Sequence, residues 1–168
     1  MRVMPKAILA VVASALVLSV SVGAAVSAAA KAPPAKMFQS GYNKCKLASL
    51  AAINMTTGKK FAKGTFDGKT CTWSSSDGNY VILIDTHPSG YLLVVPSVGT
   101  HPGEVVKRIT IRGASKAVLE THSFANTHRY QKDLFAEFPQ GVVQVSMDYS
   151  TALPDSKLVA VLKLVTHT

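Results

Sequence analysis

The chain has 168 residues, of which 48% are hydrophobic, and it carries 18 Lys and Arg against 9 Asp and Glu, a formal net charge of +9. A chain of this size and hydrophobicity is expected to bury a single core without needing many disulfides. Lysine dominates the positive charge and aromatic side chains are sparse. This composition excludes nucleic acid from the expected partners, because nucleic-acid grooves combine arginine with stacking rings.

The first residues have the pattern of a secretory signal peptide. Two basic residues, Arg2 and Lys6, precede an apolar run over 7–22, and small residues follow the run. Val26-Ser27-Ala28 satisfies the small-x-small rule for cleavage, so the sequence predicts a signal peptide over 1–28. A second cleavage position follows Ala30.

The apolar run does not favour an anchor of either kind. A bilayer-spanning helix needs roughly 20 strongly apolar residues, and this run is shorter and rich in Ala and Ser. A lipid anchor needs a cysteine directly after the apolar run, whereas the first cysteine is Cys45. We therefore expect a secreted protein, neither lipidated nor stably inserted in a membrane, in an oxidising compartment.

The segment that follows the cleavage zone is rich in Pro, Ala and Lys. This composition predicts a disordered tether over 29–40. Residues 41–168 are predicted to form a single globular domain, which we expect to be a monomer.

Positive charge is concentrated in the segment 31–70. It holds one acid, Asp67, and eight lysines, namely Lys31, Lys36, Lys44, Lys46, Lys59, Lys60, Lys63 and Lys69. Residues 71–168 balance eight basic against eight acidic residues. The asymmetry favours contact with an anionic envelope polymer, phospholipid headgroups or an acidic protein through Lys59, Lys60, Lys63 and Lys69. The alternative is a solvated face that keeps the protein soluble.

Two cysteines, Cys45 and Cys71, remain in the mature chain, and an even pair outside the cytoplasm predicts a disulfide. The loop that it closes has 27 residues, counting both cysteines. The chain-entropy model converts this loop to about 3.5 kcal/mol of stability. We expect a structural bond and not a redox-active pair, because the Cys-x-x-Cys spacing is absent.

The first predicted element of the domain is a short helix through Thr57. Ser49 has the character of an N-cap, and Gly58 is placed to end the helix. The basic, glycine-containing segment 59–69 is predicted to be a loop or an irregular edge segment.

A hairpin follows, because predicted strands over 70–76 and 80–85 flank Asp77-Gly78. Both turn residues tolerate positive φ, which favours a tight turn. Cys71 and Trp73 alternate onto one face of the first strand, so the disulfide is expected to pin the first helix against the sheet. Trp73 is predicted to belong to the core and not to a binding platform.

The rest of the chain adds strands and a closing helix. Segment 91–98 is predicted as a strand or a helix, segments 105–111, 117–121, 130–137 and 142–149 as strands, and segment 153–165 as a helix capped by Asp155, with a strand as the alternative. Phe138-Pro139-Gln140-Gly141 predicts a second hairpin. The order of elements indicates an α+β domain with a largely antiparallel sheet packed by an N-terminal short helix and a C-terminal helix.

Two stretches resemble a family of actinobacterial secreted proteins and lipoproteins of unknown function. The first is Cys45-Lys46-Leu47-Ala48-Ser49, which precedes the helix that ends at Gly58. The second is Gly68-Lys69-Thr70-Cys71-Thr72-Trp73. Together they follow the family's signature, which is Cys-x-Leu, a helix, Gly, and then Gly-x-x-Cys-x-Trp. The resemblance covers about residues 42–165. It implies an α+β envelope or extracellular domain with a Cys45–Cys71 disulfide, no established enzymatic chemistry and a binding role. The chain departs from the family in lacking a lipid-attachment cysteine, and Ser115 stands where the family has a glycine.

The sequence predicts no catalytic residue and no metal site. No Gly-x-Ser-x-Gly elbow occurs, and Ser89, Asp85 and His87 are neighbours on one extended segment that do not converge into a triad. The histidines, His87, His101, His122, His128 and His167, do not follow metal-binding spacings. Acids are spread singly, which argues against a carboxylate pair, and phosphate-binding glycine loops are absent, so no cofactor is expected.

We therefore interpret the chain as a secreted, non-catalytic binding protein of the cell envelope or the extracellular space. Its partner is expected to be an anionic polymer or an acidic protein. Two alternatives stay open. One is a small secreted hydrolase with His87, His122 or His128 as a base, and the other is a secreted inhibitor that presents a loop held by the disulfide.

Overall fold

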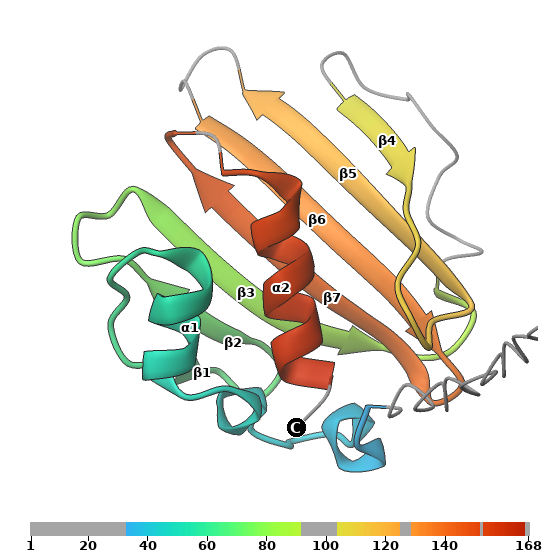
Figure 1. Ribbon diagram of the computed structural model, residues 1–168. Helices are drawn as coiled ribbons and strands as arrows, with labels where there is room; N and C mark the ends of the chain where they lie inside the picture. Colours follow the sequence, from blue (N-terminus) through green and yellow to red (C-terminus); the bar gives the residue numbers. More distant parts are fainter. Residues whose placement is uncertain (1–32, 92–103, 125–128, 152, 167–168) are drawn as a thin grey trace, which may run out of the picture.

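The computed structural model describes residues 33–91, 104–124, 129–151 and 153–166. The strands are β1 (Thr65–Phe66), β2 (Cys71–Ser74), β3 (Tyr80–His87), β4 (Glu104–Arg108), β5 (Lys116–Phe124), β6 (Arg129–Phe138) and β7 (Gly141–Tyr149). The helices are α1 (Leu50–Thr57) and α2 (Asp155–Thr166), and two 3-10 turns, η1 (Ala35–Phe38) and η2 (Lys44–Leu47), precede them. These residues form one seven-stranded sheet with both helices on the same side (Figure 1).

The strand order in the sheet is β1-β2-β3-β7-β6-β5-β4, and every neighbouring pair is antiparallel. The last strand in the chain, β7, lies between β3 and β6, so it joins the N-terminal half of the sheet to the C-terminal half. This arrangement confirms the predicted α+β class, with a short N-terminal helix, a C-terminal helix and a single disulfide.

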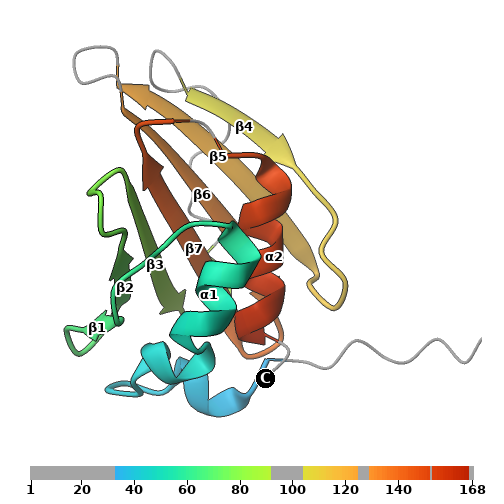
Figure 2. The same ribbon diagram turned by 60° about the vertical axis from the view of Figure 1, so that its left-hand side comes forward.

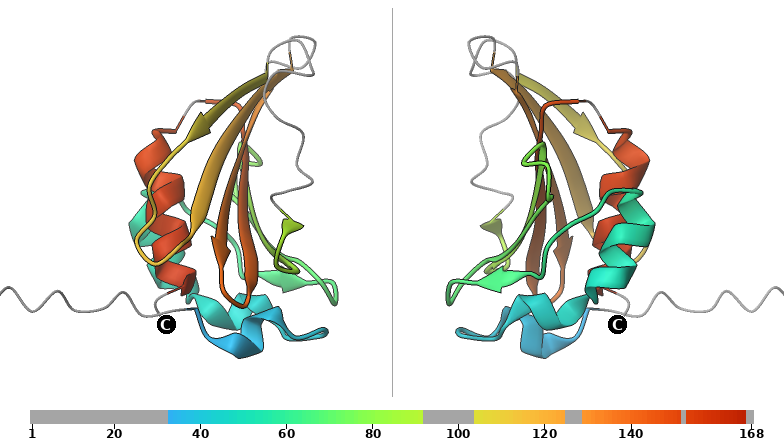
Figure 3. Two further views of the ribbon diagram at one scale, coloured as in Figure 1. Left: turned by 90° about the vertical axis from the view of Figure 1, so that its right-hand side faces the viewer. Right: turned by 90° about the vertical axis from the view of Figure 1, so that its left-hand side faces the viewer.

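The hydrophobic core lies between the helices and the sheet. Figure 3 shows both helices against one face, and Figure 2 shows α1 and α2 side by side. On β7 the side chains of Val143, Val145 and Met147 share the helix-covered face, as the alternation predicted, and all three are buried. The core side chains of the other strands include Trp73, Ile82, Ile84, Leu119 and Leu134.

The short helix α1 begins and ends where the sequence predicted. The Ser49 hydroxyl accepts a hydrogen bond from Ala52 N at 3.1 Å, which satisfies a backbone amide of the first turn. Gly58 adopts φ 73°, the left-handed conformation that favours glycine after a helix. Ile53 and Thr57 face the core.

The closing helix α2 confirms the predicted helix and excludes the strand alternative. Leu158, Val161, Leu162 and Val165 recur at helical spacing and are buried. Asp155 differs from its predicted role, because it is the first helical residue and not the N-cap. Its carboxylate accepts a hydrogen bond from Lys132 Nζ on β6 at 2.6 Å, so a contact with the sheet replaces the local cap.

Both predicted hairpins are present, and the strands differ in length from the prediction. Strand β2 is shorter than the predicted 70–76. Strand β3 continues to His87 and β5 continues to Phe124, since their pairing partners β7 and β6 extend that far. Strand β4 ends at Arg108, before Ile109 and Ile111. Segment 92–98 lies outside the described residues.

The disulfide joins Cys45, within η2, to Cys71 at the start of β2. Trp73 is buried two residues further along β2, as predicted. Gly64 packs so closely against this corner that a Cβ atom there would lie 2.7 Å from the Trp73 ring and 3.0 Å from Cys45 Sγ. The disulfide, the tryptophan and the glycine backbone therefore form one close-packed unit that fastens η2 to the sheet.

The prediction of a disordered tether over 29–40 is wrong for residues 33–40. Residues 35–38 form η1, and the Met37 side chain is fully buried. Phe38 packs against the sheet so closely that a Cβ atom on Gly141 would lie 2.7 Å from its ring. The content of Pro, Ala and Lys predicted disorder, but packing of the apolar side chains Met37 and Phe38 orders the segment. The predicted signal peptide over 1–28 lies outside the described residues, and no helix among those that are described has the length and apolarity to span a membrane.

Removing the disulfide is expected to destabilise the domain by about 3.5 kcal/mol, because the crosslink restricts the unfolded chain. Urea unfolding of the double variant Cys45→Ala/Cys71→Ala measures this loss. Reductant should lower the stability of the wild-type protein by a similar amount and leave the double variant unchanged. A wild-type protein that unfolds identically with and without reductant would contradict the structural role of the bond.

The turn residue Asp77 is expected to make stability depend on pH. Hydrogen bonds from the Ser75 hydroxyl and the Asn79 amide lower the pKa of Asp77 to about 2. A lowered folded-state pKa contributes stability that is present above the unfolded value of 3.8 and is lost as pH falls towards about 2. Asp77→Asn should therefore be less stable than wild type at neutral pH, and the difference should shrink over this interval in urea titrations. A difference that is constant with pH would show that the charge has no role.

Candidate functional site

The face of the sheet opposite the helices carries polar side chains on its central strands. Because successive residues of a strand point to opposite faces, the residues that alternate with the core positions lie on this helix-free face. They include Asp85 and His87 of β3, Gln144 and Ser146 of β7, Gln131 and Asp133 of β6, Glu120 and His122 of β5, and Glu104 of β4. Asp133 and Ser146 are buried although they lie on this face.

Five of these side chains form a hydrogen-bonded group that we call the buried polar cluster: His87, Gln131, Asp133, Gln144 and Ser146. Asp133 is 4% exposed and accepts at both carboxylate oxygens. Gln131 donates to its Oδ2 at 2.8 Å, and Gln144 and Ser146 both donate to its Oδ1. Gln144 Oε1 in turn lies 2.7 Å from His87 Nε2. The members therefore satisfy one another's hydrogen bonds, which buried polar groups require.

A second group adjoins the cluster at Asp133. It consists of Glu104, Glu120 and His122, which we call the Glu–His triangle. Glu104 is directly opposite His122 in the β4–β5 register, and Glu120 is directly opposite Asp133 in the β5–β6 register. The potential ligand atoms of the triangle lie within 4.8 Å of one another. His122 Nε2 is 3.8 Å from Glu120 Oε2 and 3.7 Å from Asp133 Oδ2.

The Glu120 carboxyl group has an unfavourable environment for a negative charge. The residue is 7% exposed, and its Oε1 atom accepts no hydrogen bond. Burial raises the pKa of Glu120, and the neighbouring carboxylates Asp133 and Glu104 raise it further, while His122 acts in the opposite direction. An unsatisfied buried carboxylate is destabilising, so this group gains from a proton or a cation.

The histidines and serines do not adopt the geometry of a hydrolytic triad among the described residues. Asp133 stands between Ser146 and His122, so the Ser146 hydroxyl donates to a carboxylate and not to an imidazole. His87 stacks on Tyr91 with ring centres 3.9 Å apart. Asp85, the acid nearest to His87 in the sequence, lies 3.2 Å from Lys69. His101, His128 and His167 lie outside the described residues.

Two of the four predicted binding lysines, Lys59 and Lys60, lie near the turn that joins β2 to β3. Ser76 N donates to Lys60 O at 3.2 Å, which places this segment beside the hairpin turn. Lys59 Nζ lies 4.5 Å from the centre of the Tyr80 ring, so its charge rests over an aromatic face. Lys60 is exposed.

The other two, Lys63 and Lys69, lie further along the β1–β2 edge. Lys63 is in the segment that leads into β1, and Lys69 is in the β1–β2 turn, at the opposite end of β2 from Lys60. Both side chains are exposed. The four lysines are therefore distributed along the β1–β2 edge and do not converge on one point.

Lys44, another member of the basic segment, is a structural residue. It is 3% exposed, its Nζ donates to Lys69 O, and it lies 5.7 Å from the centre of the Phe66 ring. Burial lowers the pKa of Lys44, against the attraction of Asp85. Lys44 therefore stabilises the β1–β2 turn and does not contribute to the exposed basic surface.

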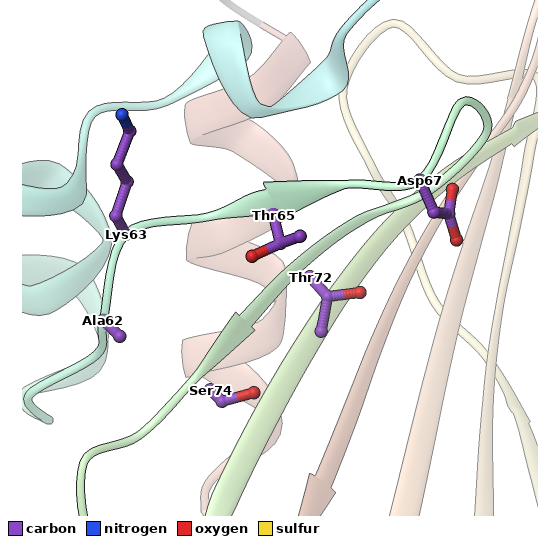
Figure 4. Close-up of a pocket in the computed structure, with 6 residues that line it drawn as sticks. All are labelled: Ala62, Lys63, Thr65, Asp67, Thr72 and Ser74. Carbon is purple, nitrogen blue, oxygen red and sulfur yellow. The ribbon is translucent and has the colours of Figure 1, made fainter.

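A shallow hollow of about 340 Å³ lies on the β1–β2 edge. Figure 4 shows Lys63 at one end of it, Asp67 at the other, and the hydroxyls of Thr65, Thr72 and Ser74 between them. Hydrogen bonds from Thr70 N and Lys69 N lower the pKa of Asp67, so its carboxylate stays charged and engaged with the turn.

Sequence reasoning did not identify the buried polar cluster or the Glu–His triangle. Glu120 and His122 are two residues apart, which places both side chains on the same face of a strand. The metal-ligand spacings typical of helices do not include this one. The available signal was Glu120-Thr121-His122 at the end of the predicted strand 117–121, with His122 one residue beyond it. Glu104 had no such signal, because only the β4–β5 register brings it beside His122.

The comparisons with known proteins return no match to this chain among family models, curated proteins or solved structures. The resemblance to an actinobacterial secreted family therefore stays a prediction.

The buried polar cluster is expected to depend most strongly on Asp133. Asp133→Ala leaves two amide donors and one hydroxyl without their acceptor and should lower the free energy of unfolding by about 3 kcal/mol, whereas Ser146→Ala should cost about 1 kcal/mol. Urea unfolding measures both. As a matched control, Asp148→Ala removes a half-exposed carboxylate paired with Arg129 on the same face, and should cost less than about 1 kcal/mol. Equal losses for the two aspartates would contradict this account of the cluster.

Proposed function

We propose that the protein is a secreted, non-catalytic binding protein of the cell envelope or extracellular space, and that it contacts an anionic polymer or an acidic protein along its β1–β2 edge. The signal-peptide pattern over 1–28 supports secretion. The Cys45–Cys71 disulfide supports an oxidising compartment, where such bonds persist.

The observation that carries the proposal is the exposure of lysines along one edge of the sheet. Lys60, Lys63 and Lys69 are all exposed there. Asp67 is the single acid of segment 31–70, and its Oδ1 atom accepts two backbone hydrogen bonds from its own turn. A surface with this sign of charge attracts polyanions over a range of about 10 Å at moderate salt.

The hollow on this edge supplies the polar donors that an anionic group needs. Lys63 and the hydroxyl-bearing side chains of Thr65, Thr72 and Ser74 line it, with the Lys63 ammonium directed away from the hydroxyls and Asp67 at the other end (Figure 4). Ammonium and hydroxyl groups donate hydrogen bonds to phosphate and carboxylate oxygens. Because the hollow is shallow, it fits one repeating unit of a polymer or one acidic side chain that rests on the surface.

The test measures binding of the mature protein to immobilised polyphosphate and polyglutamate at about 50 mM and about 500 mM salt. The double variant Lys60→Gln/Lys63→Gln should bind roughly ten-fold more weakly at low salt, because two charge contacts are lost, each worth on the order of 0.7 kcal/mol. Binding of the wild type should fall steeply at high salt. Surface plasmon resonance resolves both effects.

The matched control is Lys107→Gln/Lys163→Gln, which removes the same net charge from exposed positions on β4 and α2. Its binding should stay near that of the wild type. Equal weakening by the two double variants would contradict a localised site, and binding that is insensitive to salt would contradict the electrostatic proposal. If the Lys60→Gln/Lys63→Gln variant binds normally but aggregates, the role of these lysines is to keep the edge strand from pairing with other chains.

A further inference from the structure

We propose that Glu104, Glu120 and His122 form a binding site for a divalent transition-metal cation, with Zn²⁺ as the probe. The site is separate from the basic β1–β2 edge, so this inference is independent of the proposed function. It departs from the sequence-based expectation of no metal site, which rested on helical spacings.

The three side chains project from two adjacent antiparallel strands onto the helix-free face. Glu120 and His122 alternate along β5, and Glu104 faces His122 directly from β4. Ligands on paired strands are held more firmly than ligands on loops, because the ladder of backbone hydrogen bonds limits their movement. The fold therefore brings three potential ligands to one place without a contribution from any loop.

The spacing of the triangle suits a shared cation. Its ligand atoms lie within 4.8 Å of one another. Zinc binds imidazole nitrogen and carboxylate oxygen at about 2.0–2.2 Å, so two ligands of one tetrahedral ion stand roughly 3.4 Å apart. Rotations of the two glutamate side chains, which are long and flexible, close the remaining gap of about 1 Å.

Glu120 supplies the second, independent observation. Its side chain is nine-tenths buried, and one carboxylate oxygen has no hydrogen-bond donor. His122 Nε2 lies 3.8 Å from Glu120 Oε2, which is longer than a hydrogen bond. A buried carboxylate in this position lacks compensation for its lost hydration, and a bound cation provides it.

The surroundings of the triangle add a further carboxylate beside His122. Asp133 Oδ2 lies 3.7 Å from His122 Nε2, and Asp133 is itself fixed by hydrogen bonds from Gln131, Gln144 and Ser146. The negative charge of Asp133 beside the triangle favours a cation there.

The ligand set indicates the class of metal. One imidazole and two carboxylates match Zn²⁺ and related first-row ions better than Ca²⁺ or Mg²⁺, which prefer ligand sets made of oxygen alone. Three protein ligands leave at least one coordination position for water or for a donor group of a bound molecule. The site therefore leaves a bound metal able to take a further donor group.

The experiment titrates the full secreted chain, after treatment with EDTA and removal of the chelator, with ZnCl₂ by isothermal calorimetry. We expect one equivalent to bind in the micromolar range or tighter, and the thermal midpoint to rise with added Zn²⁺. Glu120→Gln and His122→Ala should each weaken binding roughly ten-fold or more and abolish the Zn²⁺-dependent rise in midpoint. Mg²⁺ and Ca²⁺ at the same concentrations should bind at least roughly ten-fold more weakly.

A matched control comes from the same face of the sheet. Glu137→Gln alters an acid outside both the triangle and the buried polar cluster, and should leave Zn²⁺ binding unchanged. Metal-free Glu120→Gln should unfold no earlier than the metal-free wild type, because it neutralises the buried carboxylate, so loss of binding is separable from loss of folding. Zn²⁺ binding that persists in both triangle variants, or that requires millimolar Zn²⁺ in the wild type, would overturn the proposal.

Discussion

The rest of the fold depends on β7, the central strand of the sheet. It is hydrogen-bonded along one side to β3 and along the other to β6, and most of its residues are buried on both faces. Residues on one face, such as Val145, pack beneath α1 and α2. Residues on the other face, such as Gln144 and Ser146, are polar; Ser146 is buried and Gln144 is partly buried. Buried polar groups need hydrogen-bond partners, and these two find theirs in Asp133 and His87 on the neighbouring strands, which builds the buried polar cluster.

Hydrogen-bond satisfaction within the polar face decreases from β7 towards β4. Asp133 on β6 accepts bonds at both oxygens, whereas Glu120 on β5, its direct register partner, keeps an oxygen without a donor. Proteins tolerate a local violation of this kind where another interaction, such as a bound ligand, offsets its cost. The proposed cation site includes Glu120, whose Oε1 atom accepts no hydrogen bond.

The two proposed binding sites carry side chains of opposite charge. The β1–β2 edge carries exposed lysines, of which Lys63 borders the hollow, and the β4–β5 end carries carboxylates with His122. Four strands of the sheet, β2, β3, β7 and β6, lie between β1 and β5. An anionic ligand and a cation would therefore be attracted to different places on the molecule. Because the effects of substitutions at distant sites are additive, a substitution at one site should not change binding at the other.

Local chemistry in the sequence was sufficient for the elements that depend on near neighbours. The Ser49 cap, the Gly58 terminus and the Asp77-Gly78 turn are decided within a few residues, and the pairing of Cys45 with Cys71 follows from there being two cysteines. Tertiary structure alone decided the strand order, the burial of the N-terminal segment and the separation of the lysines along an edge. It also assembled the triangle. Alternation along a strand shows which side chains are polar, but not whether they face water or contact polar side chains of the neighbouring strands. Only the register of β4 against β5 places a glutamate beside a histidine eighteen positions later in the chain.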